Sequence, residues 1–225
     1  MNIISAQKLS KVYHRGAEAI RAVDGISIDI ARGDFVSFVG ASGSGKTSLL
    51  HLLGCLDDPS EGFLQVADTT VYKDDKALGE RKLTKLRREY FGYIFQKFYL
   101  IPTLTVKENI MVPFAFHRNP GMRQNVTEIA TLLGLEKRLD HLPKEISGGE
   151  MQRVAIARAM VNNPQVILAD EPTGNLDSKR SEEIAEILNS LNRDRGITII
   201  LVTHNQDLAQ KAGRIIELRD GKLLV

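Results

Sequence analysis

A glycine-rich stretch in the first quarter of the chain has the spacing of a phosphate-binding loop. Residues 40–47 read Gly-x-x-x-x-Gly-Lys-Thr and stand between a strand-like apolar run and a helix-like run. Glycines let backbone N–H groups turn toward phosphate oxygens, and the N-terminus of the following helix adds positive potential. Lys46 would charge-pair with the terminal phosphates of a nucleotide, and the Thr47 hydroxyl would bind Mg²⁺. The predicted phosphate contacts are Gly40, Ala41, Ser42, Gly43, Ser44, Gly45, Lys46, Thr47 and Ser48.

Two adjacent carboxylates close an apolar run much later in the chain. Residues 166–169 are apolar, as is typical of a strand buried on both faces, and Asp170 and Glu171 follow directly. Ligands of an open parallel sheet bind outside the carboxyl ends of its strands, so both acids are expected beside the phosphate loop. Asp170 is suited to hold Mg²⁺ through water, and Glu171 to orient or deprotonate an attacking water. A solvated strand end is the alternative interpretation.

A histidine and a glutamine follow two further strand-like runs. His204 comes after Thr203 at the end of the run 197–202, so it is expected at the same sheet edge as Asp170. Its imidazole could there hydrogen-bond a γ-phosphate and fix the attacking water. Gln96 follows the run 91–95, where its amide could reach Mg²⁺ and the water; a surface glutamine is the alternative. The remaining histidines are interpreted as structural or surface residues: His14, His51, His117 and His141.

A second short motif predicts another anion site. Ser147, Gly148 and Gly149 precede a helix-like run that starts at Glu150. The free N–H groups and the dipole of a helix N-terminus attract anions. Because the chain already has a complete phosphate loop, a second anion site is redundant within one copy.

The sequence between the motifs predicts the elements that position them. We expect strands at residues 26–30 and 34–39 and a helix at residues 47–56. Between the buried strands at 166–169 and 197–202, apolar residues at helical spacing from 184 to 191 predict a further helix. A strand–helix–strand unit indicates an α/β fold with a mostly parallel sheet and covering helices. Residues 214–225 are expected to form a hairpin. Between residues 97 and 163, helical periodicity indicates an inserted helical subdomain, with breaks at Pro102, Pro113, Pro120 and Pro143.

The composition limits the classes of function. The chain has 225 residues, a formal net charge of +2 and one cysteine, Cys55, interpreted as a small buried side chain. No internal disulfide can form, a reducing cytoplasm is the expected setting, and neither a nucleic-acid nor an acidic partner is implied. Neither an apolar run long enough to span a membrane nor a secretion signal is visible, so we expect another chain to hold the protein at any membrane. Four basic residues are expected on a solvated helix face, with lipid head groups or a membrane partner as the alternative: Lys82, Lys85, Arg87 and Arg88.

Four motifs resemble the ATP-binding cassette (ABC) family: in chain order, the phosphate loop, the Ser147 motif, the pair Asp170 and Glu171, and His204. The resemblance runs from residue 3 to about residue 224. It implies one ABC ATPase domain, with a P-loop NTPase (RecA-like) core at residues 1–96 and 164–225, an antiparallel N-terminal β part, and a helical insertion at 97–163. It also implies ATP and Mg²⁺ as cofactors and Tyr13 stacked on adenine. In the family, two copies pair head to tail, and the motif Ser147, Gly148, Gly149 and Glu150 of one copy caps the γ-phosphate bound by the other. Asp177 would line the seam.

The resemblance further implies that dimer closure drives transmembrane permease subunits at the inner face of the cell membrane. Residues 91–98, 100–109 and 172–177 are similar to the lipoprotein-releasing and macrolide-export branch (LolD/MacB type), which moves lipoproteins, peptides or drug-like cargo. The alternatives are a cell-division type lever without cargo, a soluble repair or translation ATPase, and a nucleotide-binding switch without turnover. Met151 and Ile146 depart from the residues that family members often carry, which affects only details of the dimer contact.

Overall fold

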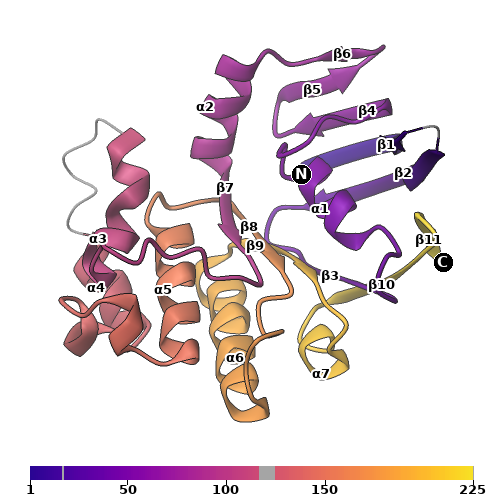
Figure 1. Ribbon diagram of the computed structural model, residues 1–225. Coiled ribbons are helices and arrows are strands. Elements are labelled where there is room, and N and C mark those ends of the chain that lie inside the picture. The colour runs from indigo at the N-terminus through magenta and orange to yellow at the C-terminus, as the bar shows by residue number, and fades with distance from the viewer. Residues whose placement is uncertain (17, 117–124, 225) are drawn as a thin grey trace.

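A mostly parallel sheet forms the centre of the molecule (Figure 1). The computed structural model describes residues 1–16, 18–116 and 125–224, so Val225, His117 and the predicted break at Pro120 lie outside the described residues. The sheet has the order β11-β10-β3-β9-β8-β7, in which β11 pairs antiparallel with β10 and the other neighbours are parallel. Its strands are β3 (Phe35–Val39), β7 (Phe91–Ile94), β8 (Val166–Asp170), β9 (Thr198–Val202), β10 (Arg214–Arg219) and β11 (Lys222–Leu224). The predicted α/β fold is confirmed.

A second, antiparallel sheet lies beside the first. Its order is β2-β1-β4-β5-β6, so β1 pairs both with the next strand and with one that follows much later. The strands are β1 (Asn2–Arg15), β2 (Glu18–Ala31), β4 (Glu61–Val66), β5 (Thr69–Lys73) and β6 (Lys76–Ala77). This is the antiparallel N-terminal part that the family resemblance implies.

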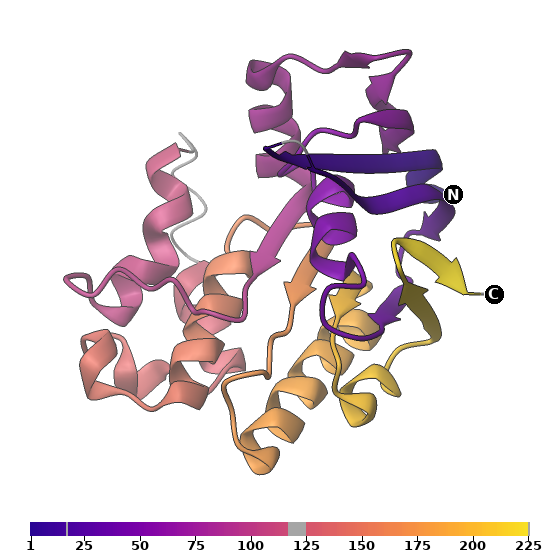
Figure 2. The same ribbon diagram turned by 45° about the vertical axis from the view of Figure 1, so that its right-hand side comes forward.

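The helices fall into two groups (Figures 1 and 2). The helices α1 (Lys46–Leu53), α2 (Glu80–Tyr90), α6 (Ser178–Arg195) and α7 (Gln206–Ala209) follow strands of the two sheets. The other group forms one side of the molecule: α3 (Val106–Met111), η1 (Val112–Phe116), α4 (Asn125–Leu132), η3 (Glu136–Arg138), η4 (Pro143–Glu145) and α5 (Gly148–Met160). The division into core and inserted subdomain stays a prediction. Among the helices that the structure describes, none combines the length and apolar character that crossing a bilayer requires.

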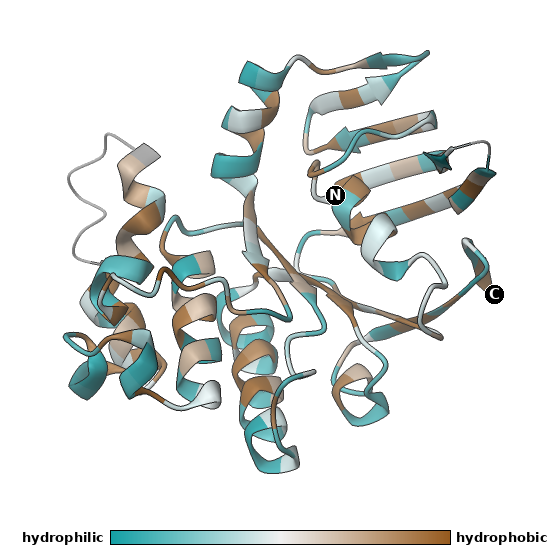
Figure 3. Ribbon diagram, viewed as in Figure 1, coloured by the Kyte–Doolittle hydropathy of each residue, from teal (hydrophilic) through white to brown (hydrophobic). Residues whose placement is uncertain are grey.

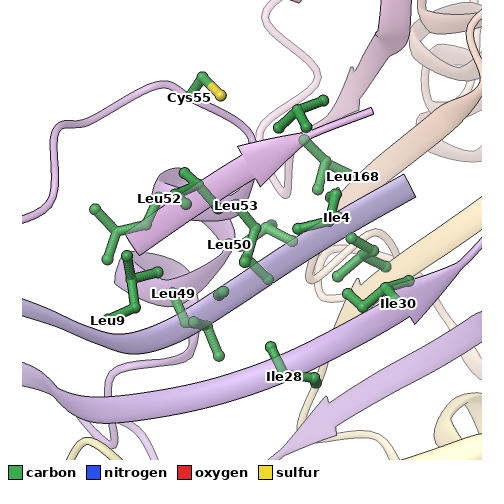
Figure 4. Close-up of a cluster of buried hydrophobic side chains, with 14 of the residues drawn as sticks. Ile4, Leu9, Ile28, Ile30, Leu49, Leu50, Leu52, Leu53, Cys55 and Leu168 are labelled. Atoms are coloured by element: carbon green, nitrogen blue, oxygen red, sulfur yellow. The ribbon is translucent and has the colours of Figure 1, made fainter. Parts of the chain in front are cut away.

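The parallel sheet separates two apolar cores, because successive side chains of a strand point to opposite faces. On β8, Leu168 belongs to the core that includes α1 and the antiparallel sheet, whereas Ile167 belongs to the core that includes α4, α5 and α6. Ile200 and Ile199 divide in the same way on β9. Figure 4 shows leucines of α1 packed in the first core, and the central strands are brown in Figure 3.

Two local expectations need correction. The helix expected at 47–56 begins at Lys46 and ends at Leu53, because Gly54 caps it and Cys55 takes a left-handed φ of 58°. Arg87 is not simply solvated: its guanidinium donates to the Cys55 carbonyl oxygen at 2.9 Å and pairs with Glu80. Cys55 itself is buried, as expected.

Candidate functional site

The phosphate loop approaches other backbone too closely for any residue but glycine at two positions. A Cβ on Gly40 would lie 2.2 Å from the Leu218 carbonyl oxygen, and one on Gly45 would lie 2.1 Å from that of Ala22. Both glycines also have positive φ, at 148° and 101°. The strand β3 therefore passes into α1 through a turn that only a glycine-rich sequence can form.

Lys46 is held inside this loop. Its Nζ donates to the carbonyl oxygens of Gly40 at 2.9 Å and Ala41 at 2.8 Å, and the residue is 7% exposed. A buried ammonium with only neutral acceptors is well placed to pair with an anion, because the loop carbonyls do not neutralise its charge.

The loop opens onto a cavity of about 680 Å³. Gln96, Glu171 and His204 share its lining with the loop, although they follow three different strands. They meet because β7, β8 and β9 are parallel neighbours that end at the same edge. The lining residues are Ala22, Ser42, Gly43, Gly45, Lys46, Thr47, Ser48, Gln96, Glu171 and His204.

Asp170 ends β8 and reaches the phosphate loop. The Thr47 hydroxyl donates to Asp170 Oδ1 at 3.1 Å. Burial raises the pKa of Asp170 above its ordinary value, and the hydrogen bond from Thr47 opposes that rise. A hydroxyl, a carboxylate and the nearby Gln96 amide are hard oxygen donors, the set that Mg²⁺ prefers beside phosphates. These residues therefore fit a magnesium ion.

Glu171 is held by three donors in a strained backbone conformation. Its φ is 46°, which is rare for a residue with a side chain and typical of functional sites. Its Oε2 accepts from Thr203 Oγ1 at 3.2 Å and from the His204 backbone N–H at 3.3 Å, and its Oε1 lies 2.8 Å from His204 Nδ1. The carboxylate of Glu171 is 15% exposed and the His204 ring 68% exposed. His204 thus combines a bond to Glu171 with a ring facing the cavity and solvent.

Gln96 is fixed against the loop that follows Glu171. The backbone carbonyl oxygen of Gln96 accepts from Asn175 Nδ2 at 2.8 Å. Gly174 admits the Gln96 side chain, because a Cβ at Gly174 would lie 2.8 Å from Gln96 Nε2. The segment after β7 and the segment after β8 therefore touch at the cavity.

Ser147 caps helix α5 in a reciprocal arrangement. Its Oγ accepts from the Glu150 N–H at 3.3 Å, and Glu150 Oε2 accepts from the Ser147 N–H at 2.8 Å. Arg138 Nε donates to Glu150 Oε1 at 2.7 Å, and this bond together with the one from Ser147 lowers the pKa of Glu150 to about 2. The ionised Glu150 is thus neutralised by Arg138 beside the helix N-terminus.

Asp177 lies close to the Ser147 motif. It caps α6 by accepting from the Arg180 N–H at 2.9 Å, and its other oxygen lies 3.2 Å from Arg180 Nη1. The Arg180 stem packs on Gly149, whose Cβ would lie 2.9 Å from Arg180 Cδ. None of residues 147–150 and 177 lines the phosphate-loop cavity in the described part of the chain. The structure thus groups the predicted site residues into two separate places.

Tyr13 lies on β1 beside the phosphate loop rather than in the lining of the cavity. Its hydroxyl donates to Asp57 Oδ2 at 2.8 Å, and it also interacts with the side chain of Ser48. Whether the ring stacks on a base stays a prediction.

Sequence reasoning missed several residues that hold the site. Thr203 was visible only as the neighbour of His204, and Asn175 only as part of a motif. Arg138 gave no signal, because its contact with Glu150 depends on how the loop before α5 folds back. Ala22 lines the cavity through the β1–β2 hairpin, which no local pattern connects to the phosphate loop.

Comparisons with known proteins found similar sequences and similar folds. A family model described as "ABC transporter" matches residues 23–174. The macrolide export ATP-binding/permease protein MacB of Brucella melitensis is 42% identical over 224 residues, which are 99% of this chain and 34% of that protein. MacB of Escherichia coli (strain K12) is 44% identical over 225 residues, with the same shares of 99% and 34%. The chain thus spans about a third of the length of these curated relatives.

Two solved structures are similar over nearly their whole length. The dimeric post-hydrolysis state of the ATP-binding cassette MJ0796, bound to ADP and Pi, has a TM-score of 0.89 and 40% identity, covering 99% of this chain and 97% of that one. CbiO1 from Clostridium perfringens, part of the transporter complex cbiONQ, has a TM-score of 0.86 and 26% identity, covering 100% of this chain and 87% of that one.

Proposed function

The chain belongs to the ABC transporter family, and from that membership we propose that it hydrolyses ATP to ADP and phosphate to drive a transmembrane permease. The observation that carries this proposal is the meeting of Lys46, Thr47, Glu171 and His204 around one cavity. A charged lysine, a metal-binding hydroxyl and an acid fixed by a histidine are the parts that phosphate-bond hydrolysis needs.

We assign roles to the residues as follows. The loop from Gly40 to Ser48 holds the phosphates, and Thr47, Gln96 and Asp170 hold Mg²⁺, which supplies charge neutralisation when bound. Glu171 orients or deprotonates the attacking water, because Thr203 and His204 fix its carboxylate toward the cavity. The ring of His204 also donates to the γ-phosphate through Nε2, which requires the imidazolium form because Nδ1 already bonds Glu171.

Two copies complete each site. The Ser147 motif is outside the cavity of its own chain, so it is free to cap a phosphate bound by a second copy, with Asp177 at the seam. The dimeric state of the MJ0796 cassette bound to ADP and Pi supports this arrangement.

The permease docks in an apolar groove of about 560 Å³ that is lined by residues of α2, β7, η1 and α5. Its lining includes Thr84, Phe95, Tyr99, Pro113 and Arg158, and Tyr99 is 63% exposed. This groove is adjacent to Gln96, so a docked segment would act on the nucleotide site. We place the cassette at the inner face of the cell membrane, where it exports or mechanically moves lipoprotein, peptide or drug-like cargo. Of these, the export of drug-like cargo is supported by the name of the MacB relatives, which are macrolide export ATP-binding/permease proteins.

The test combines turnover with assembly state. We expect Mg-dependent phosphate release from the native chain and none from Glu171→Gln, whose mass by light scattering doubles with Mg-ATP. Glu182→Gln, an exposed acid on α6, is the matched control and should hydrolyse ATP normally. Undiminished hydrolysis by Glu171→Gln would remove Glu171 from its role. A Glu171→Gln protein that stays monomeric with saturating ATP would contradict the head-to-tail dimer in the isolated chain.

A further inference from the structure

Tyr13 is the centre of a charged cluster that the catalytic scheme does not use. Lys11 and Tyr13 of β1 both bond the side chain of Asp57, so they lie on the same side of the strand. Lys11 Nζ donates to Asp57 Oδ1 and to the Asp58 carbonyl oxygen, each at 2.6 Å, and it lies 5.1 Å from the centre of the Tyr13 ring. Tyr13 Oη donates to the other oxygen of Asp57 at 2.8 Å. One carboxylate therefore binds both side chains.

The ion pair between Lys11 and Asp57 is largely shielded from water. The side chain of Lys11 is 13% exposed and that of Asp57 31% exposed. Burial alone would raise the pKa of Asp57, but the hydrogen bonds from Lys11 and Tyr13 outweigh it and hold that pKa below its ordinary value. A shielded ion pair keeps its geometry better than a solvated one.

Asp57 also fixes where the ring lies relative to the phosphate loop. It follows α1 (Lys46–Leu53), the helix that the loop begins. The ring hydroxyl is tethered to this loop-and-helix unit, and Lys11 places its cation over the ring. Tyr13 nevertheless stays 37% exposed. A tethered aromatic ring with an exposed part is a platform for a flat, stacking ligand.

We propose that Asp57 is a positioning residue that, with Lys11, holds the Tyr13 ring as a platform for the adenine base. The proposal rests on the proposed ATPase function, and it assigns recognition of the base to a carboxylate outside the phosphate loop. Asp57 acts through Tyr13 and touches no phosphate. Its removal therefore affects only ligands that carry a base.

The test compares a ligand with the base and one without it. Mg-ADP and Mg-pyrophosphate binding to the full chain is measured by calorimetry, and neither requires turnover. Asp57→Ala and Tyr13→Phe should each weaken ADP binding by about threefold to tenfold, which corresponds to one lost hydrogen bond. The double variant should bind ADP no more weakly than the single variant with the lower affinity, because both substitutions remove the same bond. Tyr13→Ala should weaken ADP binding by about fivefold to 150-fold, because stacking itself is lost.

Pyrophosphate binding should be unchanged in all of these variants. Asp58→Ala is the matched control, because Asp58 contacts Lys11 through its backbone carbonyl and its side chain is exposed; its ADP affinity should equal that of the native chain. Equal losses for ADP and pyrophosphate, or no loss of ADP affinity in Asp57→Ala, would overturn the proposal. A native chain that binds both ligands equally would also overturn it while leaving the phosphate site intact. A native chain that binds neither would refute the proposed function itself.

Discussion

Replacing Thr203 with valine tests whether the hydroxyl that holds Glu171 matters for hydrolysis. Thr203 is fully buried, and its hydroxyl accepts from the Asn205 N–H at 3.0 Å while donating to Glu171 Oε2 at 3.2 Å. The Asn205 bond occupies an acceptor position, so the hydroxyl hydrogen is directed at the carboxylate. Valine keeps the shape of threonine and removes both bonds.

Two separate losses follow from this substitution. The Asn205 N–H loses its acceptor, and leaving a buried polar group unpaired destabilises a protein by about 1–3 kcal/mol. That corresponds to a fall in Tm of about 2–4 °C for each kcal/mol in a chain of this size. Glu171 keeps its two contacts with His204 but loses the third donor. Because displacement of a catalytic group by about 1 Å can lower the rate about a hundredfold, we expect kcat to fall about tenfold to a hundredfold. The KM for ATP should stay constant, since Thr203 does not line the cavity.

The assay is phosphate release against Mg-ATP concentration, with thermal unfolding measured on the same samples. Thr198→Val is the matched control: Thr198 is a buried threonine at the other end of β9, and its hydroxyl accepts from the Gly33 N–H at 2.9 Å. It should lower Tm similarly and leave kcat unchanged, while Thr203→Ser should recover most of the activity. A folded Thr203→Val protein with native kcat would refute the reasoning, as would an equal loss of kcat in Thr198→Val.

Three further predictions follow from single side chains. Glu150→Gln should lower the free energy of unfolding by about 1 kcal/mol at pH 7, an amount discounted for the partial exposure of Glu150. Because the pKa of Glu150 is depressed from 4.5 to about 2, the difference in stability between the variant and the native chain should be present above pH 4.5 and vanish as the pH falls through 2. A difference in denaturant melts that does not change with pH would contradict this prediction. Burial raises the pKa of Cys55 to about 12, so a thiol reagent at pH 8 should modify it only after unfolding, and rapid labelling of the native chain would count against that burial. Lys46→Ala should weaken Mg-ATP binding about tenfold or more, since it removes the charge that the loop encloses; unchanged affinity in equilibrium titrations would mean that the loop does not cradle phosphates.

The parts of the site that can be predicted from the sequence are those whose position depends on neighbouring residues in the chain. Gly40 and Gly45 mark a turn that few other sequences can form, and the run before Asp170 is apolar enough to identify a buried strand. His204 was expected at the edge where Asp170 lies, and the pairing of Asp170 with Val202 confirms that position. The catalytic roles of these residues stay predictions.

The rest depends on contacts between distant segments. The placement of β1 between β2 and β4 follows from pairing across more than fifty residues, and the alternation of side chains alone does not choose a partner strand. Thr203 meets Glu171 only because β8 and β9 are neighbours. Asp57 meets Lys11 and Tyr13 only after the antiparallel sheet packs against the end of α1. No local pattern carries that information.

The partition of the interior by the parallel sheet implies that loss-of-function alleles should sort into two groups. Shortening a core side chain, as in Leu53→Ala, would open a void between α1 and the antiparallel sheet, next to the phosphate loop. Leu133→Ala would instead open a void in the other core, among α4 and α5, the helix that Ser147 caps. An allele of the first group should impair the copy's own nucleotide. An allele of the second should impair the Ser147 motif, which we propose caps the nucleotide bound by the second copy. In the head-to-tail dimer that we propose, a cell that expresses one allele of each kind would form a mixed dimer with one intact composite site. The two groups should therefore complement each other partially, while alleles within a group should not.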